Sequence, residues 1–381
     1  MCLRSRFRFV TAAVVAFLTA AGTRPGWAQK ADTTTLPRVL IITTGGTIAG
    51  VQPKPGTLGD YRAGALGAKE LLAAVPVISD YARIETEAFA AVASTMITPA
   101  QWIALARRID DALRAQPDLA GVVVTHGTDR LEETAFFLYL TVRSEKPVVV
   151  VGAQRPATGI SPDGPINLLA AVRTAASPRS VGKGVMVVMD DRLISAREAR
   201  KYYPRAGGFD GGEMGMLGVM SASGPEYFFA PVRRRGPASE FDPTALTTLP
   251  DVDLVFAYPG GTGRQYDTLP AGVVVSSTGF TCAETGSYQH LARSGVVVVT
   301  AFPSGEHVAA QRVRRDSVGA SAGGGGRESC PDLVSSGLYT APWVPSVAVQ
   351  HLTPQKARIL LMLALTKTRD PREVQRYFDA Y

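Results

Sequence analysis

Two short motifs each place a threonine just beyond a run of apolar residues. In TTGGTIAG, Gly45–Thr47 follows an apolar strand predicted over Leu40–Thr44, and His126–Asp129 follows another predicted over Gly121–Thr125. A threonine hydroxyl becomes a nucleophile when a neighbouring base removes its proton. Ligands of open parallel α/β sheets bind beyond the carboxyl ends of the strands. Both motifs therefore indicate a catalytic site at that edge of a sheet.

The glycines of the first motif do not have the spacing of a nucleotide-binding loop. They stand at relative positions one, two and six (Gly45, Gly46 and Gly50), with Thr47 where a dinucleotide fingerprint needs its second glycine. No Gly-Lys-Ser/Thr follows, which also excludes a P-loop. Two interpretations remain open: a tight turn that presents the Thr47 hydroxyl to a ligand, or a turn in which Thr47 only caps a neighbouring element.

The second motif also has a purely structural interpretation. Asp129 precedes a predicted helix and Glu132 stands three residues on, which is the spacing of an N-cap and its capping partner. Two threonines at strand ends, with a carboxylate beside one of them, favour a site instead.

Two residues are candidates for the base that activates a threonine. Lys201 lies in SAREARKYY and Tyr61 in GTLGDYRAGALG. A lysine beside a carboxylate and a threonine can accept a proton if the pocket disfavours its charge. For each of them, the alternative is an exposed surface position without a catalytic role.

Strands that alternate with helices must position these residues. Apolar runs flanked by turn residues recur at 38–43, 121–125, 147–152 and 184–189. A helix is predicted over Pro99–Arg114, with Thr98 as its cap and Gln101 completing a capping box. The apolar segment RLEETAFFLYLTV predicts a second, largely buried helix. This order predicts an α/β fold whose larger N-terminal domain is a flavodoxin-like or Rossmann-like, mostly parallel sheet covered on both faces.

The alternation lapses after about Gly218, which predicts a second domain. We expect an N-terminal domain over 36–228, a linker over 229–250 and a smaller C-terminal α/β domain over 251–381. Strands are predicted in that domain at 253–257, 272–276 and 295–300, with a last helix from Thr353 to about Lys367. The glycine-rich tract 317–326 is predicted to be a mobile loop.

Residues 1–28 have the composition of a secretory signal peptide. Arginines precede an uncharged run over 9–22, and the small residues Gly26 and Ala28 occupy the positions that signal peptidase inspects. The run is too short for a spanning helix. The segment holds four arginines and no acidic residue, so its removal lowers the formal net charge from +7 to +3. We therefore expect neither a nucleic-acid partner nor, after cleavage, a membrane partner.

Cysteine and histidine usage gives no metal signature. After Cys2 leaves with the leader, Cys282 and Cys330 remain, and a disulfide between them is compatible with an oxidising compartment. Neither lies in a C-x-x-C or Cys/His pattern, and the four histidines are scattered along the chain. With no nucleotide or metal motif, we expect no cofactor.

Several longer segments resemble one known family. The chain is similar to the bacterial type II L-asparaginases and the related glutaminase-asparaginases in TTGGTIAG, VVVTHGTDRLEETAFFLYLTV, KPVVVVGAQRP, DGPINLLAAV and LTPQKARILLMLALTKTRDP. The similarity runs from about Leu36 to the C-terminus. It implies a homotetramer with active sites between neighbouring subunits, which hydrolyses a side-chain amide without a cofactor.

The resemblance also implies catalytic roles. Thr47 matches the nucleophile, and Tyr61 matches a tyrosine on a flexible lid that assists it. Thr128, Asp129 and Lys201 match a second catalytic set, in which Asp129 also pairs with the substrate α-amino group.

Further residues match the family's substrate-binding positions. Ser94 matches the residue that holds the substrate α-carboxylate, and Thr95 occupies the next position, where relatives usually carry Gln or Glu. Ala153 matches a residue whose backbone carbonyl meets the leaving amide. The resemblance also places Gly46 and Gly127 at the substrate.

The sequence departs from the family pattern around the implied substrate pocket. Arg130 replaces a Thr or Ser, and Thr281 stands where many relatives have an Asn contributed by the neighbouring subunit. The segment 317–343 is longer than in relatives, and Glu328 within it is the candidate for a neighbouring-subunit Glu. These changes concern the preference between asparagine and glutamine rather than the reaction type.

The sequence thus predicts a periplasmic amidohydrolase that converts L-asparagine, and L-glutamine as a second candidate, to the acid and ammonia. An amidotransferase subunit of the same fold is disfavoured by the secretory leader, because tRNA-dependent chemistry needs the cytoplasm. A periplasmic binding protein that kept the amino-acid pocket and lost turnover remains the alternative from another class.

Overall fold

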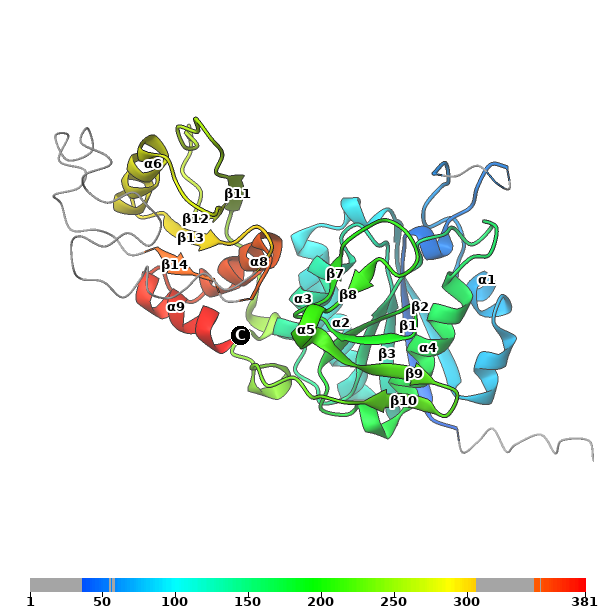
Figure 1. The fold of residues 1–381 in the computed structure, drawn as a ribbon. Helices are drawn as coiled ribbons and strands as arrows, with labels where there is room; N and C mark the ends of the chain where they lie inside the picture. The colour runs from blue at the N-terminus through cyan, green and yellow to red at the C-terminus, as the bar shows by residue number, and fades with distance from the viewer. Residues whose placement is uncertain (1–35, 55, 57–58, 306–345, 350) are drawn as a thin grey trace, which may run out of the picture.

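The computed structural model describes residues 36–54, 56, 59–305, 346–349 and 351–381. Within them the chain forms an eight-stranded sheet in the order β10-β9-β6-β5-β4-β3-β1-β2 and a four-stranded sheet in the order β11-β12-β13-β14 (Figure 1). The predicted α/β class, with a larger N-terminal and a smaller C-terminal part, is confirmed. None of the described helices is long and apolar enough to cross a membrane. The predicted leader, 1–28, lies outside the described residues.

The larger sheet is parallel through its centre and antiparallel at one end. Strands β2, β1, β3, β4 and β5 pair in parallel, whereas β6, β9 and β10 add antiparallel pairs. The strands are β1 (Arg38–Gly45), β2 (Arg83–Val92), β3 (Leu119–Thr125), β4 (Val148–Val151), β5 (Val185–Met189), β6 (Arg192–Ser195), β9 (Met216–Ser221) and β10 (Gly224–Tyr227). The four strands predicted for this part are confirmed. The half-exposed β2 and the antiparallel end were not predicted, because they lack a continuous apolar run.

Helices cover both faces of this sheet, because every central strand is apolar on both sides. Along β1, Leu40 and Ile42 pack in one cluster with α2 (Pro99–Ala115) and α3 (Leu131–Thr141), whereas Val39 and Ile41 pack in another with α1 (Ala68–Ala73) and α4 (Gly164–Ala176). Successive strand residues point to opposite faces, so an uninterrupted apolar run requires cover on both. The capping box that Thr98 and Gln101 form at α2 is confirmed.

In the described residues, the pairs of the smaller sheet are all parallel, and three helices pack with it. It consists of β11 (Val252–Phe256), β12 (Gly272–Ser276), β13 (Val297–Ala301) and β14 (Val347–Ala348), with α6 (Cys282–Arg293), α8 (Pro354–Ala364) and α9 (Pro371–Ala380). The helix predicted from Thr353 to about Lys367 is confirmed as α8, capped by Thr353 and ending at Ala364, but it is not the last helix, since α9 follows. Asp370 caps α9 ahead of Pro371. Tyr377 and Tyr381 pack against buried Phe241 of the predicted linker.

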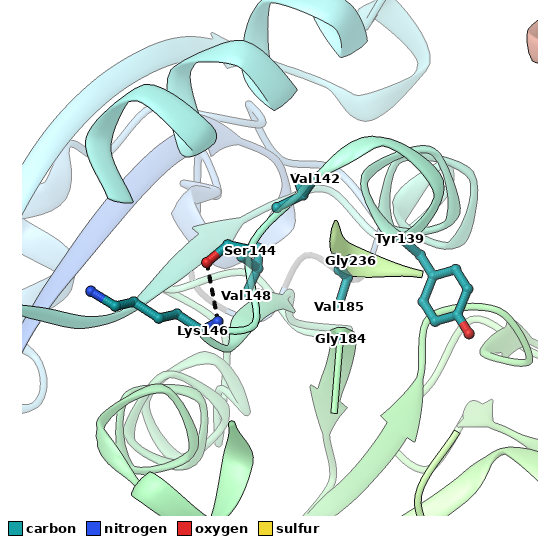
Figure 2. Close-up of a pocket in the computed structure, with 8 residues that line it drawn as sticks. All are labelled: Tyr139, Val142, Ser144, Lys146, Val148, Gly184, Val185 and Gly236. Atoms are coloured by element: carbon teal, nitrogen blue, oxygen red, sulfur yellow. Dashed lines mark hydrogen bonds between the residues drawn. The ribbon is translucent and has the colours of Figure 1, made fainter. Parts of the chain in front are cut away.

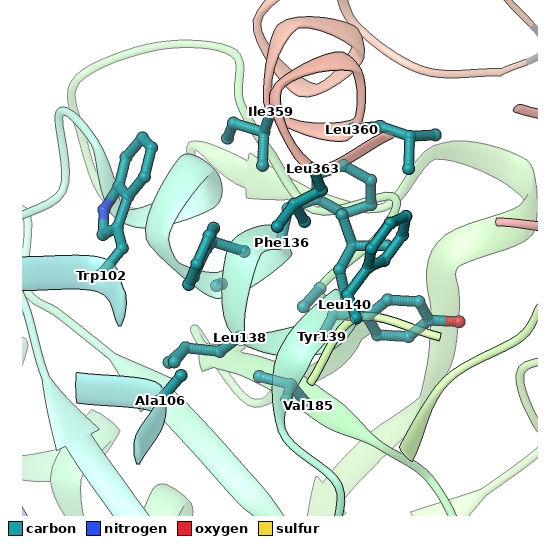
Figure 3. Packing of buried hydrophobic residues seen from close by; sticks show 14 of the residues in the cluster. Trp102, Ala106, Phe136, Leu138, Tyr139, Leu140, Val185, Ile359, Leu360 and Leu363 are labelled. Carbon is teal, nitrogen blue, oxygen red and sulfur yellow. The ribbon is translucent and has the colours of Figure 1, made fainter. Parts of the chain in front are cut away.

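A continuous apolar core joins the two sheets. Figure 3 shows Phe136, Tyr139 and Leu140 of α3 beside residues of α8, among them Ile359 and Leu363. Nine of the eleven residues of α3 are fully buried or nearly so, which confirms the predicted burial of this helix. A helix buried on all sides needs neighbours on all sides. The body of α3 therefore binds the C-terminal part, while its amino end reaches the carboxyl edge of the larger sheet.

Cys282, at the start of α6, is disulfide-bonded. Its expected partner Cys330, the glycine-rich tract 317–326, the insertion 317–343 and the candidate Glu328 all lie outside the described residues.

Buried Asp110 makes stability depend on pH. This carboxyl group of α2 accepts the backbone N–H of Arg143 at 3.0 Å, and burial raises the pKa of Asp110 from 3.8 to about 6. The folded chain thus binds the proton more tightly than the unfolded chain, and the free energy of unfolding falls as pH rises from about 4 to about 6. Asp110→Asn should remove that fall and stabilise the protein at pH 7.5 by up to about 3 kcal/mol, as measured by urea unfolding at pH 4.5 and 7.5.

The neighbouring variant Asp111→Asn is the matched control. Asp111 is an exposed residue of the same helix that pairs with Arg114, so its replacement should leave the pH dependence of unfolding unchanged. A wild-type pH dependence in Asp110→Asn would contradict this account.

Candidate active site

The two threonine motifs meet because their strands are neighbours. β1 and β3 pair in parallel with Thr43 opposite Thr125, so both motifs leave the same edge of the sheet. Gly46 has φ +83°, and a Cβ built on it would lie 2.2 Å from the Cα of Gly127. Only a glycine at position 46 lets the two backbones touch. Thr47 and Thr128 each come directly after this contact.

Thr47 is buried and hydrogen-bonded to Tyr61. It starts the 3-10 helix η2 (Thr47–Ala49), and its Oγ1 lies 2.7 Å from Tyr61 Oη. Gly50 makes room for the tyrosine, since a Cβ there would lie 2.7 Å from Cδ2 of the ring. Gly46, and not Thr47, is the N-cap of η2. The capping interpretation of Thr47 is therefore wrong, and its hydroxyl is held beside a phenol that can exchange a proton with it.

Lys201 bonds to both polar side chains at the end of the second motif. Its Nζ donates to Thr128 Oγ1 at 2.8 Å and to Asp129 Oδ1 at 2.6 Å. Lys201 lies in the short strand β7 (Arg200–Lys201), which pairs with β8 (Phe209–Asp210). The Lys201 ammonium is mostly buried, whereas the Asp129 carboxylate is 65% exposed. Asp129 is thus open on one side to a further cationic group, such as a substrate amine.

The capping interpretation of Asp129 is wrong. Arg130 occupies the N-cap position of α3, without a side-chain cap, and the Asp129 carboxylate pairs with Lys201 instead. Glu132, the expected capping partner, accepts the backbone N–H of Lys201 at 2.7 Å. Sequence spacing alone did not identify Glu132 as part of this arrangement, because its partner is 69 residues away.

Ser94 lies against Gly127 at the end of β2. It is buried, starts the 3-10 helix η4 (Ser94–Met96), and accepts the backbone N–H of Arg130 at 3.2 Å. A Cβ on Gly127 would lie 3.0 Å from both Cβ and Oγ of Ser94. Thr95 follows and is exposed. The structure thus brings Ser94, Gly46 and Gly127 into one cluster.

The loop that contains Ala153 is held by α4. Asp163, at the N-cap of α4, accepts the backbone N–H groups of Gln154 and Arg155 at 2.8 Å each. Asn167 Nδ2 donates to the Gly152 carbonyl at 3.1 Å. The sequence prediction did not assign this role to Asp163. The DGPIN segment, an aspartate ahead of a helix-starting proline, was the available signal.

His126 is a neutral structural residue. Its side chain is fully buried, Nδ1 donates to the Gly127 carbonyl at 2.8 Å, and burial lowers the pKa of the imidazole to about 4. The ring therefore carries no charge at neutral pH and helps to hold the turn before Thr128. Among the described residues, no group of His, Cys, Asp and Glu has an arrangement that could hold a metal ion.

Two residues that depart from the family pattern, Arg130 and Thr281, each bond to neighbouring residues of this chain. The Arg130 guanidinium pairs with Glu133 at 2.8 Å, which keeps this cation on the helix surface. The Thr281 hydroxyl caps α6, accepting the N–H of Glu284 and donating to the Gly261 carbonyl at 2.7 Å.

A narrow crevice with almost no enclosed volume lies elsewhere in the domain. Figure 2 shows that Val142, Val148, Val185 and Gly236 are among its lining residues. Val148 and Val185 are the first residues of β4 and β5. The crevice is therefore at the opposite edge of the sheet from the threonine motifs and is not part of the candidate site.

Gly46→Ala should disrupt both folding and activity. The new Cβ would overlap the Gly127 backbone, in a conformation with positive φ that alanine rarely adopts. We expect the free energy of unfolding to fall by about 3 kcal/mol or more and turnover of any substrate at this site to be lost. Gly260→Ala is the control, since Gly260 has a similar φ of +78° but open space around it. Equal destabilisation of both variants by thermal unfolding would show that the glycine contact is unimportant.

Comparison with known proteins identifies the same two regions. A family model described as asparaginase, N-terminal, matches residues 38–233, and one described as glutaminase/asparaginase C-terminal domain matches residues 251–378. L-asparaginase 2 of Bacillus subtilis is 37% identical over 93% of this chain and 89% of its own length. A protein of Haemophilus influenzae named as a probable periplasmic L-asparaginase is 34% identical over 92% of this chain and 95% of its own.

A solved structure has the same fold. The crystal structure of a probable cytoplasmic L-asparaginase from Campylobacter jejuni superposes with a TM-score of 0.77 at 34% identity. The match covers 91% of this chain and 100% of that chain.

Proposed function

Because the chain belongs to the glutaminase/asparaginase family, we propose that it is an amidohydrolase acting on the side-chain amide of L-asparagine, with L-glutamine as a second substrate. One observation supports the proposal most directly. Lys201 donates hydrogen bonds to both Thr128 and Asp129. These two residues directly follow Gly127, whose backbone contact with Gly46 also fixes the position of Thr47. This places two hydroxyl groups, an ammonium and a carboxylate at one end of the sheet.

In the proposed first step, Thr47 Oγ1 attacks the amide carbonyl carbon. Its proton passes to a neighbouring base, for which Tyr61 Oη at 2.7 Å is the nearest described candidate. The carbonyl oxygen becomes an oxyanion, and backbone N–H groups of the glycine turn can stabilise it by about 3 kcal/mol for a well-placed donor. The C–N bond then breaks, the nitrogen takes up a proton, and ammonia leaves. The product is an ester between Thr47 and the substrate acyl group.

In the second step, water attacks this ester and regenerates Thr47. We assign the relay of that water's proton to the hydroxyl of Thr128, which accepts a hydrogen bond from Lys201. The partly exposed Asp129 carboxylate offers a counter-ion to the substrate α-amino group. Ser94 is assigned to the substrate α-carboxylate and the Ala153 carbonyl to the leaving amide. Thr95 is assigned a lesser contact because it stands where relatives usually carry Gln or Glu.

An ammonia-release assay with asparagine and glutamine tests the proposal. The protein should release ammonia from at least one of them, with the corresponding acid in equal amount. Binding of either amino acid by calorimetry, without release of ammonia, would instead identify an amino-acid-binding protein. Comparing the kcat/KM values for the two amides would establish the substrate preference.

The proposal extends to location, assembly and domain limits. We place the mature protein in the periplasm, on the basis of the leader-like residues 1–28 and of the relative named as periplasmic. We propose a homotetramer, since the family resemblance implies active sites shared between subunits. The proposed domains span 36–228 and 251–381, joined by 229–250. Cell fractionation and light scattering of the purified protein test the first two points.

A further inference from the structure

A buried lysine from the C-terminal part holds the segment that carries Lys201. Lys356 lies in the first turn of α8, is 1% exposed, and donates from Nζ to the backbone carbonyls of Ala196, Arg197 and Ala199. The first two of these hydrogen bonds measure 3.2 and 2.9 Å. The bound carbonyls belong to the turn between β6 and β7, and Lys201 follows the last of them by two residues.

The three acceptors match the three donors of an ammonium group. A protonated lysine offers three N–H bonds, whereas a neutral amine offers two. Burial lowers the pKa of Lys356 to about 8, so the ammonium form predominates at neutral pH. Placing a charge in the interior is costly, and a methionine of similar length would pack beside Phe136 without that cost. The three hydrogen bonds of the ammonium offset part of this cost and hold the three carbonyls in place.

Other residues of this segment also bond to the C-terminal part. Arg197, also buried, donates to the backbone oxygens of Tyr381 and His351. Arg200 donates to the carbonyl of Ser304. Glu132 of α3 accepts the N–H of Lys201. The main chain that leads to Lys201 is thus restrained, so the Lys201 ammonium reaches Thr128 and Asp129 from a fixed turn.

We propose that Lys356 is a positioning residue that sets the catalytic geometry of Lys201 by fixing the turn at Ala196–Ala199. This inference rests on the proposed amidohydrolase function. According to this inference, proton transfer at the carboxyl edge of the larger sheet depends on a residue from the C-terminal part of the same chain. A displacement of about 1 Å at a catalytic group can reduce turnover about a hundredfold.

The test combines Lys356→Met with Lys201→Met in a double-mutant cycle. Lys356→Met alone should lower kcat for asparagine by roughly 10- to 100-fold and change KM by less than about threefold, because Ser94, Gly46 and Gly127 are held by other elements. In the Lys201→Met background the same change should have almost no further effect on kcat, since the lysine through which it acts is gone. Lys356→Gln, which keeps two donors, should recover part of kcat.

Arg358→Met is the matched control, because Arg358 lies on the same helix and donates to the carbonyl of Val252, away from the turn. Its kcat should stay within about twofold of wild type. An equal loss of kcat from Lys356→Met with and without Lys201 would overturn the inference, as would wild-type kcat in folded Lys356→Met. If Lys356→Met does not fold, Lys356→Gln takes its place in the cycle. Failure of both to fold would assign Lys356 a purely structural role. Absence of wild-type activity would reject the proposed function instead.

Discussion

Thr47→Ala should lower kcat for asparagine by at least about a thousandfold, while the amino acid still binds. The Thr47 hydroxyl is the buried nucleophile candidate, and it is hydrogen-bonded to Tyr61 at 2.7 Å. Alanine removes the oxygen that forms the acyl ester and leaves the glycine contact beside it intact. Steady-state ammonia release gives kcat, and calorimetry gives the affinity for asparagine.

Two further variants make the Thr47 result interpretable. Thr47→Ser keeps a hydroxyl and should retain kcat within about tenfold. Thr44→Val removes another buried hydroxyl, one that donates to the Thr125 carbonyl at 2.8 Å, and should cost about 1 kcal/mol of stability with little change in kcat. Full activity of a folded Thr47→Ala protein would mean that another residue is the nucleophile.

Lys201→Met should lower kcat by roughly 10²- to 10⁴-fold with a smaller change in KM. The variant removes the donor to Thr128 and the partner of Asp129 together. The side chain keeps nearly the same length, so the packing of β7 is preserved. Rapid-quench measurement of the acyl-enzyme would show which of the two steps has slowed.

Lys146→Met is the control for loss of a lysine. The Lys146 ammonium donates to the Pro117 carbonyl at 2.6 Å on the exposed surface, so its replacement should leave kcat within about twofold. If Lys201→Met were folded and kept kcat within tenfold of wild type, proton transfer would have to be assigned to another group.

The central strands and buried helices could be predicted from sequence because their signals are local. Valine-rich runs predicted β3, β4 and β5. The start of α2 was predicted from Thr98, Pro99 and Gln101. β2 was missed because its side chains alternate in exposure and include charged residues. The antiparallel strands were missed because their pairing depends on partners distant in sequence.

The site was predictable in its residue types but not in its contacts. Motif positions identified Thr47, Thr128, Asp129 and Lys201, and the structure brings the last three into direct hydrogen bonding. Glu132 and Lys201 are 69 residues apart in the sequence, so local spacing could not predict the hydrogen bond between them.

The roles of Asp163 and Lys356 could not be predicted from the sequence either. Each depends on which backbone groups face a side chain in the folded chain. Local sequence patterns carry no such information, because backbone carbonyls and N–H groups are the same at almost every residue.

The apolar core around α3 has a consequence for how the protein unfolds. Because one helix packs against both the larger sheet and α8, neither part can separate without exposing the aromatic residues that they share (Figure 3). Denaturation should therefore proceed as one cooperative transition. Unfolding of the C-terminal part would also release the turn before Lys201. Catalytic activity should therefore be lost in the same transition as the folded structure.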